Sequence, residues 1–242
     1  MMNEGICKRT ATVRFWNGYA KWYKLWVDHT SYHAPVVSLL RETVKPGWRV
    51  LDIGAGSGVL SLPLAKMGCE VTALEPSRLM RSHLFREMFD KHAKWVEVDE
   101  RRWEDVSLMD YRCFDLVLSC NTLHFTEIGF EGALEKVFAA DPAHVLVVTE
   151  YVPGSFVRFA YASHVVAFGR TYAADSSFAY HHLSEVFDHH RYKAGRDLTL
   201  DEKRVLAHRV VRKDDHLWLE EQAHVGMYWL HRREPGMCAA LQ

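Results

Sequence analysis

Short apolar segments alternate with helix-forming segments from residue 48 to residue 149, and this alternation constrains the fold more than any other feature. We expect strands at 48–53, 70–74, 95–98, 114–119 and 144–149, with helices at 57–67, 77–90 and 128–139. Strands that alternate with helices form parallel sheets with right-handed crossovers. The last apolar run, HVLVVT, is typical of a strand buried on both faces of such a sheet. The pattern therefore predicts an α/β fold with a doubly wound, mostly parallel sheet.

The N-terminal part of the chain lies outside this alternation. Residues 15–27 are rich in Trp and Tyr at helical spacing, and a second helix is expected at 34–43. The turn-forming residues Lys45-Pro46-Gly47 end that second helix. The aromatic helix either packs on the main body or closes over a ligand pocket.

The rhythm changes again after Pro153-Gly154. Here we expect an aromatic helix at 155–169, a polar, His-rich segment at 172–191, and late strands at 203–212 and 224–232. One α/β domain accounts for a chain of 242 residues. Its expected parts are an N-terminal helical cap at 1–44, a cofactor-binding core at 45–153, an insertion after the fifth strand at 154–202 that recognises the substrate, and C-terminal strands at 203–242.

The composition is that of a globular protein, with 48% apolar and 25% charged residues. The formal net charge of −1 gives no global attraction to nucleic acid or to an anionic membrane. No apolar run approaches the ~20 residues that span a bilayer. The five cysteines are scattered without a CxxC pair, which favours reduced thiols over disulfides or a zinc site. We therefore expect a cytoplasmic protein with no membrane partner.

A glycine-rich turn ends the first expected strand, with the sequence Asp52-Ile53-Gly54-Ala55-Gly56-Ser57-Gly58. In an open α/β sheet, ligands bind beyond the carboxyl ends of the strands. Glycines there let the backbone turn sharply and approach a ligand closely, because they have no Cβ. The amides that open the following helix point to the same place. The turn therefore predicts a site for a nucleotide cofactor.

Two cofactor classes compete for this turn. Dinucleotide folds have GxGxxG with the pyrophosphate on the helix N-terminus, but here Gly58 comes one residue early and Val59 takes its place. The carboxylate of Asp52 would repel a pyrophosphate, whereas it suits a cationic ligand. Glu75 follows the turn by roughly 20 residues, where an acid can accept both ribose hydroxyls. These features favour S-adenosylmethionine (SAM), which carries a sulfonium and an ammonium, over NAD and an oxidoreductase.

The segment VLDIGAGSGVLSLPLAKMGCEVTALEPS, from Val50 to Ser77, resembles the first two motifs of the class I SAM-dependent methyltransferases of small-molecule type. FDLVLSCNTLH, at 114–124, resembles the fourth-strand motif of that family, and the helix around Trp16 and Tyr23 resembles its leading helix. The resemblance implies a Rossmann-like seven-stranded sheet with a reversed last strand. It also implies an enzyme that transfers the methyl group of SAM to an acceptor.

The resemblance also implies which residues hold the cofactor. Gly54 and Gly56 match residues that contact the methionine part of SAM, and Glu75 matches the acid that holds the ribose. Arg102 and Trp103 occupy the place where the family contacts adenine, and Trp103 either stacks on adenine or belongs to the core. The full expected set is Asp52, Gly54, Ala55, Gly56, Gly58, Glu75, Pro76, Arg102, Trp103, Ser119, Asn121, Trp16 and Tyr23.

The methyl acceptor is less constrained by the sequence. His124 is the expected base if the acceptor must lose a proton, and packing or capping at a helix start is the alternative. Enzymes that methylate adenine amines in DNA carry an Asn/Asp-Pro-Pro-aromatic motif after the fourth strand, whereas this chain has Ser119-Cys120-Asn121-Thr122. With no basic stripe either, we do not expect a nucleic-acid partner. We expect a small-molecule acceptor.

Two further alternatives remain open. In a helix, His182, Glu185 and His189 would share a face and could bind a metal, but solvent-facing histidines are the alternative, and we expect no metal site. Aromatic residues between 155 and 191 suit an apolar or planar acceptor, or equally a helical core. A catalytically idle SAM-binding scaffold or regulatory protein of the same fold is the alternative to an active methyltransferase.

Overall fold

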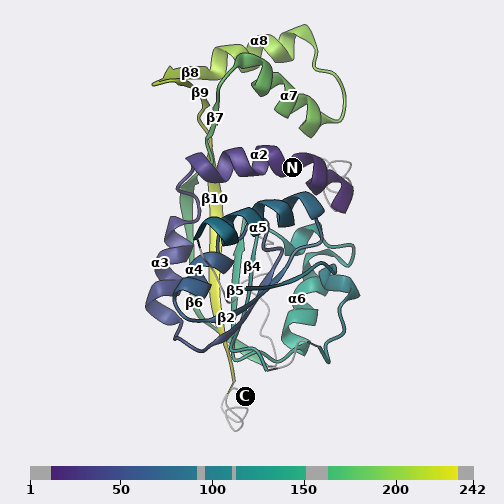
Figure 1. Ribbon diagram of the computed structural model, residues 1–242, viewed down its shortest axis with the longest axis vertical. Helices are drawn as coiled ribbons and strands as arrows, with labels where there is room; N and C mark the ends of the chain where they lie inside the picture. The colour runs from purple at the N-terminus through teal and green to yellow at the C-terminus, as the bar shows by residue number, and fades with distance from the viewer. Residues whose placement is uncertain (1–11, 92–95, 111–112, 151–162, 234–242) are drawn as a thin grey trace, which may run out of the picture.

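A seven-stranded sheet forms the centre of the computed structural model, which describes residues 12–91, 96–110, 113–150 and 163–233 (Figure 1). The strand order is β3-β2-β1-β4-β5-β10-β6. The strands are β1 (Arg49–Ile53), β2 (Glu70–Leu74), β3 (Val96–Asp99), β4 (Leu116–Cys120), β5 (His144–Thr149), β6 (His164–Asp175) and β10 (Gln222–Arg232). Only β10 runs against its neighbours β5 and β6, and the other described pairs of this sheet are parallel. This confirms the expected mostly parallel sheet with a reversed last strand.

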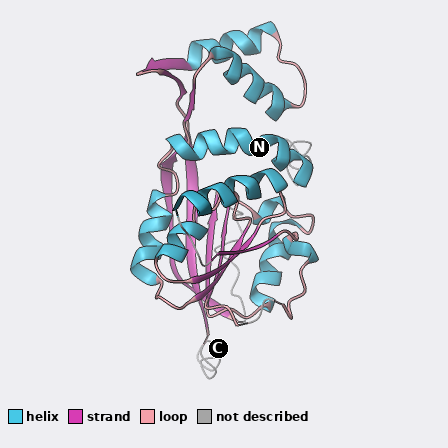
Figure 2. Ribbon diagram, viewed as in Figure 1, coloured by secondary structure: helices cyan, strands magenta, loops and turns pink. Residues whose placement is uncertain are grey.

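Helices cover both faces of this sheet (Figure 2). Helices α3 (Ala34–Thr43), α4 (Ser61–Lys66) and α5 (Arg78–Lys91) lie on one face, and α6 (Gly129–Ala139) lies on the other. Side chains of β1 alternate accordingly: Val50 packs with Leu40 and Leu64, whereas Leu51 packs with Leu134. Since burying one such side chain contributes about 2 kcal/mol, a one-residue slip of β1 would be strongly unfavourable.

The aromatic N-terminal segment forms α2 (Val13–His29), which confirms the expected helix. Its N-cap is Thr12, whose hydroxyl accepts a hydrogen bond from the backbone N–H of Phe15 at 3.1 Å. Trp22 and Trp26 are buried in the same core cluster as α3 and α4. Among the described residues, no helix is long and apolar enough to cross a membrane.

A smaller subdomain is inserted between β6 and β10, and it lies on the far side of α2 from the large sheet (Figure 1). It consists of β7 (Phe178–Tyr180), α7 (Leu183–Ala194), α8 (Leu200–Arg209), β8 (Val210–Lys213) and β9 (His216–Leu219). Its three strands form a second sheet in the order β7-β9-β8. Helix α2 is therefore enclosed between the two parts of the protein.

Two expected elements after β5 differ in the structure. Of the helix expected at 155–169, the part up to residue 162 lies outside the described residues, and His164–Asp175 is strand β6. Residues 164–175 form backbone hydrogen bonds with β10 along their whole length, and this pairing stabilises a strand although the spacing of the aromatic residues had predicted a helix. The strand expected at 203–212 is helix α8 up to Arg209, because Thr199 caps the helix and Leu206 is buried. The described insertion therefore follows β6 rather than β5.

Candidate active site

The glycine turn joins β1 to α4 at the carboxyl edge of the sheet. Gly54 and Gly56 have φ angles of 73° and 57°, in the left-handed region that disfavours side chains. The amide of Gly54 donates to the carbonyl oxygen of Leu74 at 2.8 Å, which anchors the turn to the end of β2. A Cβ on Gly54 would lie 2.3 Å from the side chain of Thr122. Glycine is therefore required here by both the backbone and the packing.

Asp52 lies on β1 just before this turn and is 2% exposed. Its Oδ2 accepts a hydrogen bond from the hydroxyl of Ser61 at 2.6 Å, at the start of α4. Burial raises the pKa of Asp52 to about 6. At pH 7 the carboxylate is mostly ionised, so it is available to attract a cationic ligand.

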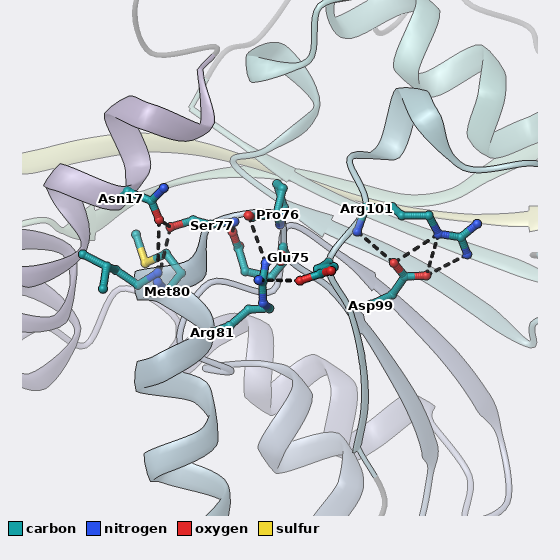
Figure 3. Close-up of polar contacts among 10 residues, drawn as sticks. Asn17, Glu75, Pro76, Ser77, Met80, Arg81, Asp99 and Arg101 are labelled. Atoms are coloured by element: carbon teal, nitrogen blue, oxygen red, sulfur yellow. Dashed lines mark hydrogen bonds and ion pairs between the residues drawn. The ribbon is translucent and has the colours of Figure 1, made fainter.

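Glu75 directly follows β2 and is 6% exposed (Figure 3). Its Oε2 accepts the backbone N–H of Gly56 at 2.9 Å, and its Oε1 accepts that of Ser77 at 2.7 Å. Burial raises the pKa of Glu75 to about 7, against the opposing effect of these two hydrogen bonds and of Arg81. A carboxylate has about four lone-pair sites, so each oxygen keeps the capacity to accept a further hydroxyl.

Arg81 holds the loop after β2, a role that the sequence did not suggest. Its guanidinium donates to the carbonyl oxygens of Glu75 and Pro76, each at 2.9 Å, and forms an ion pair with Glu100 at 2.7 Å (Figure 3). Pro76 is half-buried in this loop. The position of the Glu75 carboxylate therefore depends on α5 as well as on β2.

Helix α2 covers the turn from above. The hydroxyl of Tyr23 would lie 3.1 Å from a Cβ on Gly56. Asn17, another residue that the sequence did not suggest, accepts hydrogen bonds from the hydroxyl of Ser77 at 2.9 Å and the amide of Leu79 at 3.1 Å, at the start of α5 (Figure 3). The ring of Trp16 meets the ring of Phe125 edge-on, with centroids 5.1 Å apart. These contacts close α2 over the glycine turn.

The two residues expected near adenine are engaged elsewhere. Trp103, in the short 3-10 helix η1 (Trp103–Asp105), is 2% exposed and packs in the core beside α6. Its indole N–H donates to the carbonyl oxygen of Ala133 at 3.0 Å. The guanidinium of Arg102 pairs with Glu104 at 2.5 Å and Glu127 at 2.7 Å. Since Trp103 is a core residue, it presents no ring face for stacking.

The predicted residues at the end of β4 and just after it have different surroundings. Ser119 faces the α6 side of the sheet, and its buried hydroxyl has no hydrogen-bond partner within the described residues. His124 lies in the 3-10 helix η2 (Leu123–Phe125), and burial lowers its pKa to about 4, so it is neutral and weakly basic at pH 7. Asn121 bonds to Tyr32 and Glu150, which places it between three segments of the chain.

The histidine-rich segment does not gather around one point. His182 lies just before α7, and the carboxylate of Glu185 accepts the backbone N–H of His181 at 2.7 Å. His189 is 1% exposed and bonds to Tyr180 and Tyr19 instead. Across the described residues, no group of three or more His, Cys, Asp or Glu side chains is arranged to hold a metal ion.

Known proteins share this arrangement of turn and sheet. Residues 50–140, which include the glycine turn and Glu75, match the family described as a methyltransferase domain. A ubiquinone biosynthesis O-methyltransferase of Rhizobium leguminosarum bv. trifolii is 39% identical over 88 residues, 35% of this chain and 33% of that protein. A proposed RNA methyltransferase of Pyrococcus horikoshii has the same fold, with a TM-score of 0.56 and 16% identity over 86% of this chain and 90% of that one.

Residues 50–140 therefore match the methyltransferase domain family, and the chain has the fold of class I methyltransferases of known structure. This confirms the family and the cofactor that the resemblance implied. The chain covers a third or less of the length of the curated relatives that it matches.

The prediction that nucleic acid is not a partner is wrong. A 23S rRNA (uracil(1939)-C(5))-methyltransferase of Halomonas elongata is 50% identical over 54 residues, 22% of this chain and 10% of that protein. The absence of the Asn/Asp-Pro-Pro-aromatic motif bears only on enzymes that methylate exocyclic amines of bases. This relative is named for methylation of a ring carbon, C5 of uracil, so the absence of the motif does not exclude its class. A net charge of −1 averages over the whole surface, so it does not exclude a local site for RNA.

Proposed function

We propose that the protein binds SAM over the glycine turn and transfers its methyl group to an acceptor at the carboxyl ends of β4 and β5. The observation that carries the proposal is the buried carboxylate of Glu75, bonded to the amide of Gly56 at 2.9 Å. This contact brings the ribose-binding acid and the turn into one site. Bound SAM supplies a methyl group on a positively charged sulfur.

Each part of this site has a proposed role. Gly54 and Gly56 let the backbone approach the methionine part of SAM, Glu75 accepts the ribose hydroxyls, and Asp52 attracts the cationic end. Tyr23 and other residues of α2 exclude water. The remaining proposed contacts are Trp16, Ala55, Gly58, Pro76 and Asn121. We leave Trp103 out, because its ring lies in the core. We also leave out Arg102, which pairs with Glu104 and Glu127, and Ser119, which faces α6.

A small molecule is the first candidate acceptor, supported by the similarity to the ubiquinone biosynthesis O-methyltransferase. The inserted subdomain, at 178–219, is the proposed substrate-recognition element, because it contacts α2 directly. RNA is the second candidate, supported by the similarity to the 23S rRNA methyltransferase. Incubation of the protein with methyl-labelled SAM and separated small-molecule, RNA and protein fractions of a cell extract distinguishes these acceptors.

Calorimetry with SAM, S-adenosylhomocysteine (SAH) and NAD tests the cofactor site. We expect SAM and SAH to bind and NAD not to bind. Glu75→Ala should weaken SAH binding by at least about tenfold, since a buried hydrogen-bonding carboxylate is lost. Glu70→Ala is the matched control, because Glu70 lies exposed at the opposite end of the same strand. Binding of NAD alone, or unchanged SAH binding by Glu75→Ala, would contradict the proposal.

A further inference from the structure

Three segments meet at the side chain of Asn121, directly after β4. Its Nδ2 donates to the hydroxyl oxygen of Tyr32 at 2.6 Å, and its Oδ1 accepts the backbone N–H of Glu150 at 2.8 Å. Nδ2 also lies 3.4 Å from Oε1 of Glu150. Asn121 has a φ angle of 54°, a conformation that Asn tolerates better than most residues. The amide therefore joins the end of β4, the end of β5 and the segment between α2 and α3.

Tyr32 is the buried member of this group, with 0% exposure. Its hydroxyl oxygen accepts a hydrogen bond from the Asn121 amide, the same amide whose nitrogen lies 3.4 Å from Oε1 of Glu150. Burial, the thiol of Cys120 and the carboxylate of Glu150 all raise the pKa of Tyr32, so the phenol stays protonated. Tyr32 thus holds the Asn121 amide in place, and that amide in turn contacts Glu150.

Glu150 is the exposed member of the group, at the carboxyl end of the sheet. Its hydrogen bonds with Asn121 involve only neutral groups, a backbone N–H and a side-chain amide. Strand β4, which ends at Cys120, lies between β1, which carries Asp52 and leads into the glycine turn, and β5, which Glu150 directly follows. Glu150 therefore lies at the same carboxyl edge of the sheet as the glycine turn, with the end of β4 between them. With the cofactor over the turn, Glu150 lies on the side of β4 and β5, where the acceptor is proposed to bind.

We propose that Glu150 accepts the proton of a hydroxyl-bearing methyl acceptor, and that Asn121 and Tyr32 position its carboxylate. This inference rests on the proposed function. A lone pair of the acceptor oxygen forms the bond to the methyl carbon, the carbon–sulfur bond breaks, and its electron pair goes to sulfur, which leaves as SAH. The hydroxyl proton passes to a carboxylate oxygen of Glu150, so charge and atoms balance.

Two donor-site ligands test the position of Glu150 without an acceptor. Sinefungin is a SAM analogue in which a carbon bearing an amino group replaces the methylated sulfur, whereas SAH has neither the methyl group nor the charge. An ammonium at the methyl position should pair with a nearby carboxylate. We expect the wild-type protein to bind sinefungin about fivefold more tightly than SAH, the modest preference of a partly exposed ion pair.

Glu150→Gln should reduce this preference to less than about twofold and leave the Kd of SAH unchanged. Tyr32→Phe should reduce the preference partially, because the Asn121 amide that contacts the carboxylate loses its Tyr32 partner. Glu70→Gln is the control for removal of an exposed carboxylate, and it should keep the full preference. Thermal unfolding verifies that each variant folds. If the Glu150→Gln variant does not fold, Glu150→Asp replaces it.

The outcomes separate this inference from the proposed function. If the wild-type protein binds neither SAH nor sinefungin, the proposed function itself is overturned. If SAH binds but the wild-type protein shows no preference for sinefungin, Glu150 does not face the methyl position and the inference is overturned. A preference that survives in Glu150→Gln overturns it equally.

Discussion

The backbone amide of Gly56 donates a hydrogen bond to the carboxylate of Glu75 at 2.9 Å, although 19 residues separate the two in sequence. The contact ties the turn after β1 to the end of β2. The ribose-binding acid of the proposed site is therefore held by the same turn that approaches the methionine part of SAM. Changes at either residue should affect the other.

The affinity for SAH should depend on pH through Glu75. Burial raises the pKa of this carboxyl to about 7, so it ionises as the pH rises from 6 to 8. Because the ionised form accepts the ribose hydroxyls, SAH should bind about 5- to 10-fold more tightly at pH 8 than at pH 6, as measured by calorimetry. Glu75→Gln should remove this dependence, and a variant with the wild-type pH profile would argue against the ribose assignment.

Gly54→Ala should abolish SAH binding and destabilise the fold. Any side chain in the left-handed region costs about 1–2 kcal/mol, and here the new Cβ would also lie 2.3 Å from Thr122. Gly47→Ala is the matched control, since Gly47 has a φ angle of 83° but nothing within 4 Å of the Cβ position. Urea denaturation should show a larger loss of unfolding free energy for Gly54→Ala than for Gly47→Ala. Equal losses would contradict the predicted clash with Thr122.

Asp52→Asn should stabilise the ligand-free protein at high pH. The folded-state pKa of about 6 exceeds the ordinary 3.8, so the folded state favours the protonated form, and this stability is lost as the pH rises from 4 through 6. At pH 8 the variant should be up to about 3 kcal/mol more stable than the wild type, with no difference at pH 4. Urea denaturation at both pH values measures this difference in stability. The affinity for SAH should fall in the variant. An equal gain in stability at pH 4 and pH 8 would contradict the raised pKa of Asp52.

His189 should couple the inserted subdomain to α2. Its ring nitrogens bond to the hydroxyls of Tyr180 at 2.6 Å and Tyr19 at 2.9 Å. His189→Leu leaves two buried hydroxyls without this partner and should cost about 2–4 kcal/mol of unfolding free energy. His208→Leu, on the exposed side of α8, is the control and should cost far less.

The same histidine should also contribute to acid sensitivity. Burial lowers the pKa of His189 to about 2, so its folded form is neutral. The stability that it contributes is present above pH 6.5 and falls as the pH decreases below that value, because only the unfolded chain takes up the proton. The wild type should therefore lose more stability than His189→Leu between pH 7 and pH 5; parallel curves would contradict this.

Trp103→Phe should separate a core role from an adenine contact. The change removes the hydrogen bond to Ala133 and part of a packed ring, and should lower the unfolding free energy by about 1–2 kcal/mol. The Kd of SAH should stay within about twofold of the wild type. A tenfold weaker affinity for SAH in a fully folded variant would instead support a contact between Trp103 and adenine.

Most of the fold and half of the site could be predicted from local sequence. Strands β1 to β5, the helices between them, the glycine turn and Glu75 all lie within the family match at 50–140 or directly beside it. Their signals are local: hydrophobic period, positive φ at Gly54 and Gly56, and an acid at the next strand end. These signals can be recognised without knowing which distant residues pack against them.

The remaining assignments depended on contacts between distant residues. Whether Trp103 faces a ligand or the core is decided by the Ala133 carbonyl, 30 residues away, and Asn17 reaches Ser77 across 60 residues. The group of Tyr32, Asn121 and Glu150 joins residues up to 118 positions apart, and of these only Asn121 lies in a motif that the sequence analysis recognised. The sequence by itself determined the parallel strands β1 to β5 and the methyl donor, because local geometry encodes both. Only the tertiary structure decided which residues meet at the carboxyl ends of β4 and β5, because these groups are brought together by packing.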